Sequence, residues 1–152
     1  MTDFLLDTNA INAAVDKKVD PALITARGPV FVTHIQVNEL RATKNPEGRR
    51  QALLDALQKI DPAKVRTSVM VWDVSEWDGA NWGAPNNPYQ PLLAALNARN
   101  GSKKNNPKDA LIGVTALTRN MTLVTDDVGA GLGQSKMRHL CNEREWRDDD
   151  EP

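Results

Sequence analysis

The chain has few of the features that cross-link a protein or anchor it in a membrane. It carries one cysteine, Cys141, so no disulfide can form within the chain, and a single thiol suits a reducing cytoplasm. No apolar run is long enough for a signal peptide or a membrane span. We therefore expect a cytoplasmic protein without a membrane segment.

The chain also lacks a strong charge of either sign. Its 19 basic and 20 acidic residues give a net charge of -1, which provides no overall basic footprint for nucleic acid but allows a local basic patch. The 152 residues fit one domain with a real core. We expect a single domain over residues 1–146, followed by a disordered acidic tail, "RDDDEP", over residues 147–152.

Short apolar runs alternate with helical patterns along the chain. Strands are predicted in "DFLL", "PVFVTH", "RTSVMVWDV" and "MTLVT", with a fifth in "MRHLCN". Helices are predicted in "TNAINAAVDKK", "DPALITARG", "IQVNELRAT", "NPEGRRQALLDALQKI", "YQPLLAALNARNG" and "KDALIGVTALTRN", with a short one in "SEWDGANWG". This order predicts an α/β fold, a doubly wound and mostly parallel sheet of four or five strands with helices on both faces.

Three of the predicted helices start with a polar residue followed by proline, a typical N-cap pattern. The pairs are Asp20–Pro21, Asn45–Pro46 and Asn106–Pro107. In the third helix, an N-cap at Asn106 puts Asp109 at the third helical position, where an acid suits the helix dipole.

Carboxylates stand at the ends of two predicted strands. Asp7 closes "FLLD", and Asp126 and Asp127 close "TLVTDD". The carboxyl ends of parallel strands lie along one edge of a sheet, and ligands bind there near the switch in strand order. If the two strands are neighbours, these acids converge.

Two further acids are positioned to join them. Asp109 heads a nearly apolar helix, and Glu39 lies on the helix after the second strand. Four carboxylates in one cleft would repel and raise one another's pKa, and a bound divalent cation would relieve this. Oxygen ligands without a His or Cys pattern favour Mg²⁺ or Mn²⁺, ions that support phosphodiester hydrolysis.

Each of these acids also has a purely structural explanation. Asp7 can cap the first helix or form an Asx turn, and Glu39 can be a solvated helix residue. Asp126 and Asp127 can form a polar turn. The residues by themselves leave both explanations open.

Three blocks of the sequence resemble, in order, the motif blocks of PIN-domain nucleases, with the VapC-type toxins as the nearest group by pattern. They are "FLLDTNAI", "FVTHIQVNEL" and "DALIGVTALTRNMTLVTDD". The resemblance implies a PIN-like fold and a Mg²⁺- or Mn²⁺-dependent endoribonuclease that hydrolyses RNA. It also implies a toxin of a toxin–antitoxin pair, with a cognate antitoxin as partner.

The resemblance also implies a set of site residues. The family's catalytic and metal-binding acids match Asp7, Glu39, Asp109 and Asp127. Thr125 matches a hydroxyl that orients the last carboxylate or a metal-bound water, and Asn9 matches a polar residue near the metal.

One departure from the family pattern supports an alternative interpretation. Gly129 stands where many relatives carry a further acid after the fourth one. The alternative is a non-catalytic PIN-like scaffold that binds RNA or a protein through a degenerate metal site. A DNA-directed nuclease or a phosphatase using the same metals is a second alternative.

Basic residues add candidate contacts to the substrate. Lys103, Lys104 and Lys108 come directly before Asp109, so we predict that they bind the phosphates of the substrate.

The four tryptophans have two interpretations. They are Trp72, Trp77, Trp82 and Trp146. Such rings can stack on RNA bases, but more often they anchor a core or an interface. Trp77 and Trp82 flank a stretch that leads into a Pro/Asn loop, and we interpret them as a homodimer surface.

Overall fold

The computed structural model describes residues 2–16, 20–44, 48–125 and 137–139 of the chain. The predicted acidic tail, residues 147–152, lies outside these ranges. No helix within the described ranges has the length and apolar character that crossing a membrane requires.

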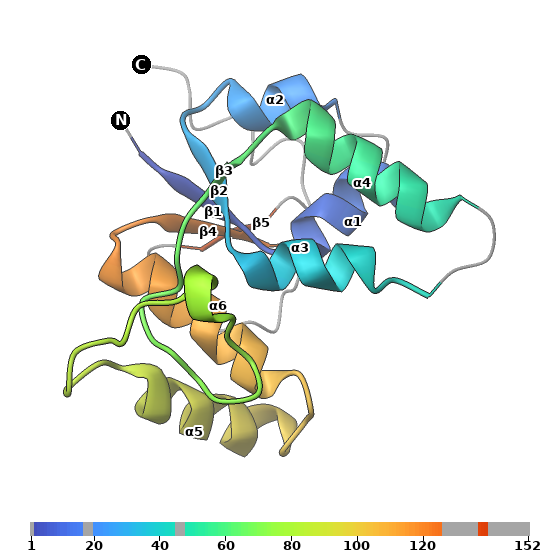
Figure 1. Ribbon diagram of the computed structural model, residues 1–152. Helices are drawn as coiled ribbons and strands as arrows, with labels where there is room; N and C mark the ends of the chain where they lie inside the picture. The colour runs from blue at the N-terminus through green and yellow to red at the C-terminus, as the bar shows by residue number, and fades with distance from the viewer. Residues whose placement is uncertain (1, 17–19, 45–47, 126–136, 140–152) are drawn as a thin grey trace.

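The centre of the molecule is a five-stranded sheet with the order β3-β2-β1-β4-β5 (Figure 1). The strands are β1 (Phe4–Leu6), β2 (Val30–Val32), β3 (Ala63–Lys64), β4 (Thr122–Thr125) and β5 (Met137–His139). All four strand pairings are parallel. The strand order runs from β1 outward to β3 on one side and from β4 outward to β5 on the other. The switch in strand order therefore falls between β1 and β4.

Helices cover both faces of this sheet, which confirms the predicted doubly wound α/β architecture (Figure 1). They are α1 (Thr8–Asp16), α2 (Pro21–Thr25), α3 (His34–Arg41), α4 (Arg49–Ile60), α5 (Tyr89–Asn100) and α6 (Asn106–Thr118), with a short 3-10 helix η1 (Trp77–Gly79). The predicted helix α6 is almost entirely buried along its middle, from Ala110 to Ala116. A helix without a polar face needs such a position.

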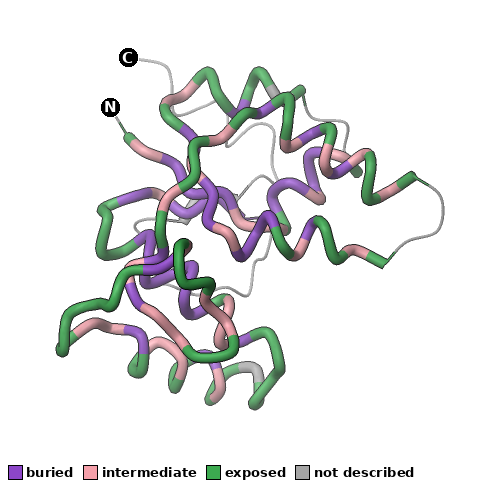
Figure 2. The backbone as a smooth tube through the Cα atoms, in the orientation of Figure 1, coloured by how far each residue is buried: buried purple, intermediate pink, exposed green. Residues whose placement is uncertain are grey.

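The central strand β1 is buried on both faces. Phe4 and Leu6 pack into one core cluster with residues of α1, α2 and α4. Leu5 packs into a second cluster with residues of α5 and α6. Successive strand residues point to opposite faces, so a strand covered on both sides requires an uninterrupted apolar run. Figure 2 shows the buried segments concentrated in the sheet and α6, and the exposed segments on the outer turns of the helices.

The predicted third strand is wrong. It was expected within residues 66–74, but the strand that pairs with β2 is Ala63–Lys64. Thr67 makes only an isolated bridge to Ala80, and Asp73 has a φ of 64°, which breaks an extended chain. The valines of this stretch pack onto the α5–α6 cluster instead. Their β-branched pattern reflects burial under a loop rather than pairing in the sheet.

The predicted start of α6 is wrong by one residue. The N-cap is Asn105 rather than Asn106, and Pro107 lies in the first turn. The side chain of Asn106 donates to Asn97 Oδ1 at 2.8 Å and to the carbonyl of Gly101 at 2.7 Å. Because its amide makes these bonds, it ties the loop before α6 to α5 rather than capping the helix.

The other two predicted helix starts have different outcomes. Asp20 caps α2 as expected, because its carboxylate accepts a hydrogen bond from the backbone N of Ala22 at 2.9 Å. The described part of α4 follows Gly48, and the predicted start at Asn45 and Pro46 lies outside the described residues.

Candidate active site

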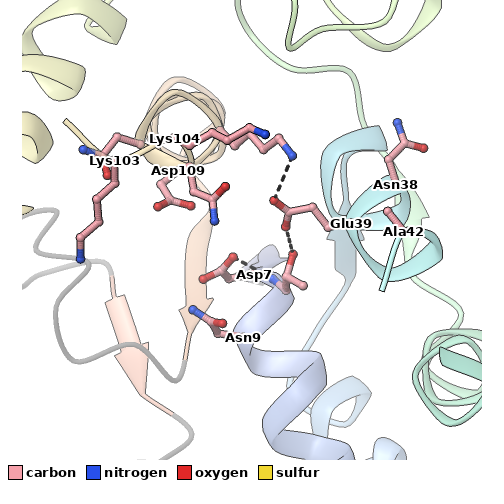
Figure 3. Close-up of a pocket in the computed structure, with 12 residues that line it drawn as sticks. Asp7, Asn9, Asn38, Glu39, Ala42, Lys103, Lys104 and Asp109 are labelled. Atoms are coloured by element: carbon pink, nitrogen blue, oxygen red, sulfur yellow. Dashed lines mark hydrogen bonds and ion pairs between the residues drawn. The ribbon is translucent and has the colours of Figure 1, made fainter. Parts of the chain in front are cut away.

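A polar cleft of about 890 Å³ opens beside Asp7, the residue directly after β1 (Figure 3). Its walls come from the start of α1, from α3, and from the loop that leads into α6. It is lined by Asp7, Thr8, Asn9, Asn38, Glu39, Ala42, Lys103, Lys104, Asn105, Asn106, Lys108 and Asp109. Open parallel sheets bind ligands at the carboxyl edge, next to the switch in strand order, and the cleft lies at this position.

Most of the predicted site residues meet in this cleft. Three of the four predicted acids, Asp7, Glu39 and Asp109, line it. The predicted substrate contacts Asn9, Lys103, Lys104 and Lys108 line it too. Asp127, its neighbour Asp126 and Gly129 lie outside the described residues, as do Cys141 and Trp146. The chemical roles of all these residues stay predictions.

Asp7 is held at the edge of the sheet by bonds to both neighbouring segments. Its backbone N donates to the carbonyl of Val124 at 2.9 Å. Its Oδ1 accepts from the backbone N of Thr8 at 2.7 Å, and its Oδ2 accepts from Thr125 Oγ1 at 2.9 Å. The local bond from Thr8 is what an aspartate that only caps the first helix or forms an Asx turn would accept. The bond from Thr125 is not needed for such a cap or turn, because it fixes the second carboxylate oxygen from another strand.

Thr125 therefore has a contact that the sequence did not predict. It is fully buried at the end of β4 and donates to the first acid of the site. Its predicted role toward Asp127 involves a residue outside the described ranges.

A chain of polar contacts crosses the cleft from α1 to α6. Thr8 Oγ1 donates to Glu39 Oε2 at 2.6 Å, and Lys108 Nζ lies 3.6 Å from Glu39 Oε1 (Figure 3). The side chains of Lys108 and Glu39 are 40% and 24% exposed, so solvent screens this ion pair in part. Thr8 was missed in the sequence, although it stands between Asp7 and Asn9 in "DTN". Its backbone holds one acid and its hydroxyl holds another.

The buried side chain of Gln36 positions α3. Its Nε2 donates to the carbonyl of Leu6 at 2.8 Å, which joins the first turn of α3 to the end of β1. Its Oε1 accepts from the backbone N of Thr33, and the Thr33 side chain caps the helix in return. Glu39 lies about one turn further along, on the same side of the helix. The signal for this residue was present, because Thr33-x-x-Gln36 is a capping-box pattern.

Charges of both signs line the cleft. Lys103 and Lys104 lie on the loop that Asn106 ties to α5, on the wall that also carries Asp109 (Figure 3). Ammonium groups attract phosphate oxygens, and carboxylates attract a hard cation. The cleft therefore suits a ligand that brings both a phosphate and a metal ion.

The donor atoms of the cleft fit Mg²⁺ or Mn²⁺ in kind, because they are carboxylate and amide oxygens without His or Cys. Within residues 2–16, 20–44, 48–125 and 137–139, no three Asp, Glu, His or Cys side chains lie close enough to hold a metal ion. Glu39 is bound to Thr8 and Lys108 instead. A metal that binds Glu39 would replace Lys108 as its cationic partner.

Away from the cleft, an ion pair joins α1 to α4. Arg49 Nη1 lies 2.6 Å from Asp16 Oδ1, and Arg49 Nη2 donates to Asn12 Oδ1 at 2.7 Å. The hydrogen bond from Arg49 lowers the pKa of the Asp16 carboxyl, and the same bond raises the pKa of Arg49. These groups stabilise the packing of two helices and take no part in the cleft.

No protein-family model and no curated protein sequence matches the chain. Its fold does match solved structures. One is the crystal structure of VapBC2 from Rickettsia felis bound to a DNA fragment from their promoter. The TM-score is 0.51 over 84% of this chain and 89% of that chain, at 20% sequence identity. The chain has a VapC-like PIN fold.

A second solved structure found is that of VapBC-5 from Mycobacterium tuberculosis, a member of the VapBC family of toxin-antitoxin systems. It has a TM-score of 0.46 over 91% of this chain and 98% of that chain, at 18% identity. The resemblance in fold that the three motif blocks predicted is therefore confirmed by the first match. At 20% sequence identity this first match shows the fold alone.

Proposed function

We propose that this protein is a metal-dependent endoribonuclease that acts as the toxin of a toxin–antitoxin pair. The observation that carries the proposal is the composition of the cleft. Asp7 and Asp109 share it with Lys103 and Lys104, next to the switch in strand order of a VapC-like PIN fold. Such a cleft pairs carboxylates for a hard cation with ammonium groups for phosphate. RNA as substrate, an antitoxin as partner and a cytoplasmic location are further parts of the proposal, drawn from the resemblance and the composition.

In the proposed site, four acids would hold one or two Mg²⁺ or Mn²⁺ ions: Asp7, Glu39, Asp109 and Asp127. When bound, such a metal would polarise the phosphodiester and favour deprotonation of an attacking water. The chain itself supplies orientation. Thr8 and Thr125 fix the two oxygens of Asp7.

Phosphate binding is assigned to the lysines. Lys103 and Lys104 would contact phosphate oxygens next to the scissile bond, and Asn9 would add an amide donor from the opposite wall. Because these contacts reach the backbone of the nucleic acid and not its bases, they would not discriminate between sequences.

The proposal is tested by incubating the full chain with Mn²⁺ and a pool of RNA, with single-stranded DNA and a phosphate monoester in parallel. We expect RNA cleavage that a chelator abolishes. Asp7→Asn and Asp109→Asn are each expected to slow RNA cleavage by more than about 100-fold. Removing a residue that only supports a metal ligand costs up to about 100-fold in activity, and these two residues are proposed to be ligands themselves. Preference for DNA or for the monoester would instead assign one of the alternative activities.

Asp61→Asn is the matched control. It removes the same charge at the C-cap of α4, outside the residues that line the cleft, and asparagine tolerates the positive φ of 49° found there. Its cleavage rate should equal that of the wild type. The nuclease proposal fails if no RNA is cleaved with Mn²⁺ and Asp7→Asn leaves the affinity for Mn²⁺ unchanged.

The contacts of Glu39 favour a second candidate function. Lys108 already supplies a cationic partner for this carboxylate, at 3.6 Å. A scaffold that binds RNA or a protein without catalysis would use the charges of the cleft and need no metal. Calorimetric titration with Mn²⁺ separates the two candidates, because only the nuclease requires saturable binding that depends on Asp7.

A further inference from the structure

Three tryptophans on the loop between β3 and α5 are mostly exposed. Trp72, Trp77 and Trp82 are 74%, 68% and 72% exposed. Trp77 contacts both of the others in edge-to-face geometry, with ring centroids 6.1 Å from Trp72 and 6.0 Å from Trp82. We refer to these three residues as the tryptophan patch. Contiguous exposed aromatic rings of this size mark an interaction site, because a chain that folds without a partner would be more stable with these rings buried.

Contacts with α3 hold the loop of the patch in place. The His34 ring accepts a hydrogen bond from the backbone N of Glu76 at Nε2, 3.2 Å away. Its Nδ1 therefore carries the proton and donates to the carbonyl of Gly79 at 3.1 Å. Asn38 Nδ2 donates to Glu76 Oε1 at 2.6 Å. A patch presented in a fixed geometry loses less entropy when a partner binds.

Every charged residue close to the three tryptophans along the sequence is acidic. Between Arg66 and Arg99 the sequence contains no Lys or Arg. The same stretch contains three acids, Asp73, Glu76 and Asp78, and each of them is exposed. This stretch therefore contributes a negative field beside the rings, and such a field attracts cations.

This field decides between candidate partners. Single-stranded RNA stacks on exposed aromatic rings, but the three carboxylates would repel its phosphates. A second copy of the chain, paired through the patch about a twofold axis, would bring the same carboxylates face to face. A guanidinium group has neither difficulty, since it stacks on the face of tryptophan and pairs with carboxylates.

We infer that the tryptophan patch docks an arginine-bearing segment of a partner protein. Interfaces concentrate their binding energy in tryptophan and arginine side chains, and the acids around the patch would supply the matching charge. The inference does not depend on nuclease activity, because neither the tryptophans nor these acids line the cleft. A homodimer stays a prediction, and under this inference its interface would lie on another surface of the chain.

The inference is tested with a fluorescently labelled peptide of alternating Arg and Ser, titrated with the full chain and followed by fluorescence anisotropy. We expect saturable binding that Trp77→Ala weakens by about tenfold or more, because Trp77 contacts both other rings. This side chain is 68% exposed, so the variant should unfold at the same temperature as the wild type. A peptide with Glu in place of Arg should not bind.

Two further variants locate the binding. Combining Asp73→Asn with Asp78→Asn removes two charges, and asparagine tolerates the φ of 64° at position 73. This double variant should weaken binding several-fold and flatten its salt dependence. Asp109→Asn, which changes the cleft, should leave the peptide affinity unchanged.

Several results would overturn the inference. One is the absence of peptide binding, and another is equal affinity for the wild type and Trp77→Ala. A peptide that loses affinity in Asp109→Asn binds the cleft and not the patch. Tighter, Trp77-dependent binding of a single-stranded oligonucleotide would assign the patch to nucleic acid. A sedimenting dimer that Trp77→Ala converts to monomer would assign it to a second copy.

Discussion

Thr125 at the end of β4 donates its hydroxyl hydrogen to Oδ2 of Asp7, 2.9 Å away, although 118 residues separate the two along the chain. The adjacent parallel pairing of β1 with β4 ends at Leu6 and Val124 and brings them together. The other oxygen of Asp7 is held by the backbone of Thr8. The geometry of the first acid therefore depends on two strands that lie far apart in the sequence.

Thr125→Val tests this contact, since valine keeps the shape of the side chain and loses the hydroxyl. We expect Mn²⁺-dependent cleavage to fall about 10- to 100-fold, as for other groups that orient a metal ligand. The free energy of unfolding should fall by about 1 kcal/mol for the lost hydrogen bond. Thr125→Ser keeps the hydroxyl and is the matched control. Equal cleavage rates in the two variants would show that the hydroxyl does not orient Asp7.

Lys108→Gln should tighten the binding of Mn²⁺. The substitution removes the cation that lies 3.6 Å from Glu39 and leaves this carboxylate to the metal. A partly exposed pair of this kind contributes about 1 kcal/mol or less, so the dissociation constant should fall by up to about fivefold in calorimetry. Lys104→Gln changes the same charge in the same cleft and should leave the constant nearly unchanged. Unchanged or weaker metal binding in Lys108→Gln would show that Lys108 and the metal do not compete for Glu39.

The pair of Asp16 and Arg49 predicts a pH dependence of stability. The pKa of Asp16 is lowered in the folded protein by the hydrogen bond from Arg49, so the folded state holds the charged carboxylate to lower pH than the unfolded chain does. The stabilisation is fully present above the ordinary pKa of an aspartate, about 4, and is lost as the pH falls through the lower folded value.

Asp16→Asn should accordingly lower the unfolding temperature at neutral pH, and the difference from the wild type should vanish in acid. Arg49→Gln removes the other half of the pair together with the hydrogen bond to Asn12, so only the part of its effect that comes from Asp16 should vanish in acid. A difference that persists unchanged in acid would assign the effect of the substitution to something other than this ion pair.

Asp126 and Asp127 should differ in their effect on cleavage. Residues two apart on an extended chain share a face, so we predict that Asp127 points to the same side as Thr125, and Asp126 to the other. Asp127→Asn should then abolish most Mn²⁺-dependent cleavage, and Asp126→Asn should have a far smaller effect. The opposite ranking of the two variants in the cleavage assay would show that the register is shifted by one residue.

The sequence was sufficient to predict the sheet and most of its helices, because buried parallel strands must be apolar runs between crossover helices. It failed for β3, whose two residues, Ala63 and Lys64, are both exposed and carry no apolar pattern. The position of this strand is decided by its pairing with Phe31 and Val32 on β2. A strand that is held only by backbone pairing with its neighbour has no pattern of apolar residues in the sequence.

The acids of the cleft were predictable for a different reason. Asp7 and Asp109 stand at the junctions of strands and helices, which topology brings to one edge. The contacts that tie Thr8 to Glu39 were not predictable, because this hydrogen bond spans 31 residues and depends on how α3 packs against β1. Packing of this kind is set by tertiary contacts such as that of Gln36 with Leu6, which a local pattern does not encode.

Gly79→Ala should destabilise the loop of the tryptophan patch. A Cβ at this position would meet the ring of His34, with the ring Cγ 2.7 Å away. The ring cannot move aside freely, because it is hydrogen-bonded to the backbone of Glu76, the N-cap of η1, and of Gly79, its last residue. Overpacking of this kind costs about 1–3 kcal/mol, to be measured as the free energy of unfolding in denaturant.

A double-mutant cycle separates the clash from any effect of alanine on the backbone. In a His34→Ala background the ring is absent, so adding Gly79→Ala should cost less than it does in the wild type, by about 0.5–3 kcal/mol. If the two substitutions are additive, the ring of His34 does not press on residue 79 and the steric explanation is wrong. A coupling of the expected sign would show that α3, which carries Glu39 into the cleft, also sets the position of η1 and of Trp77.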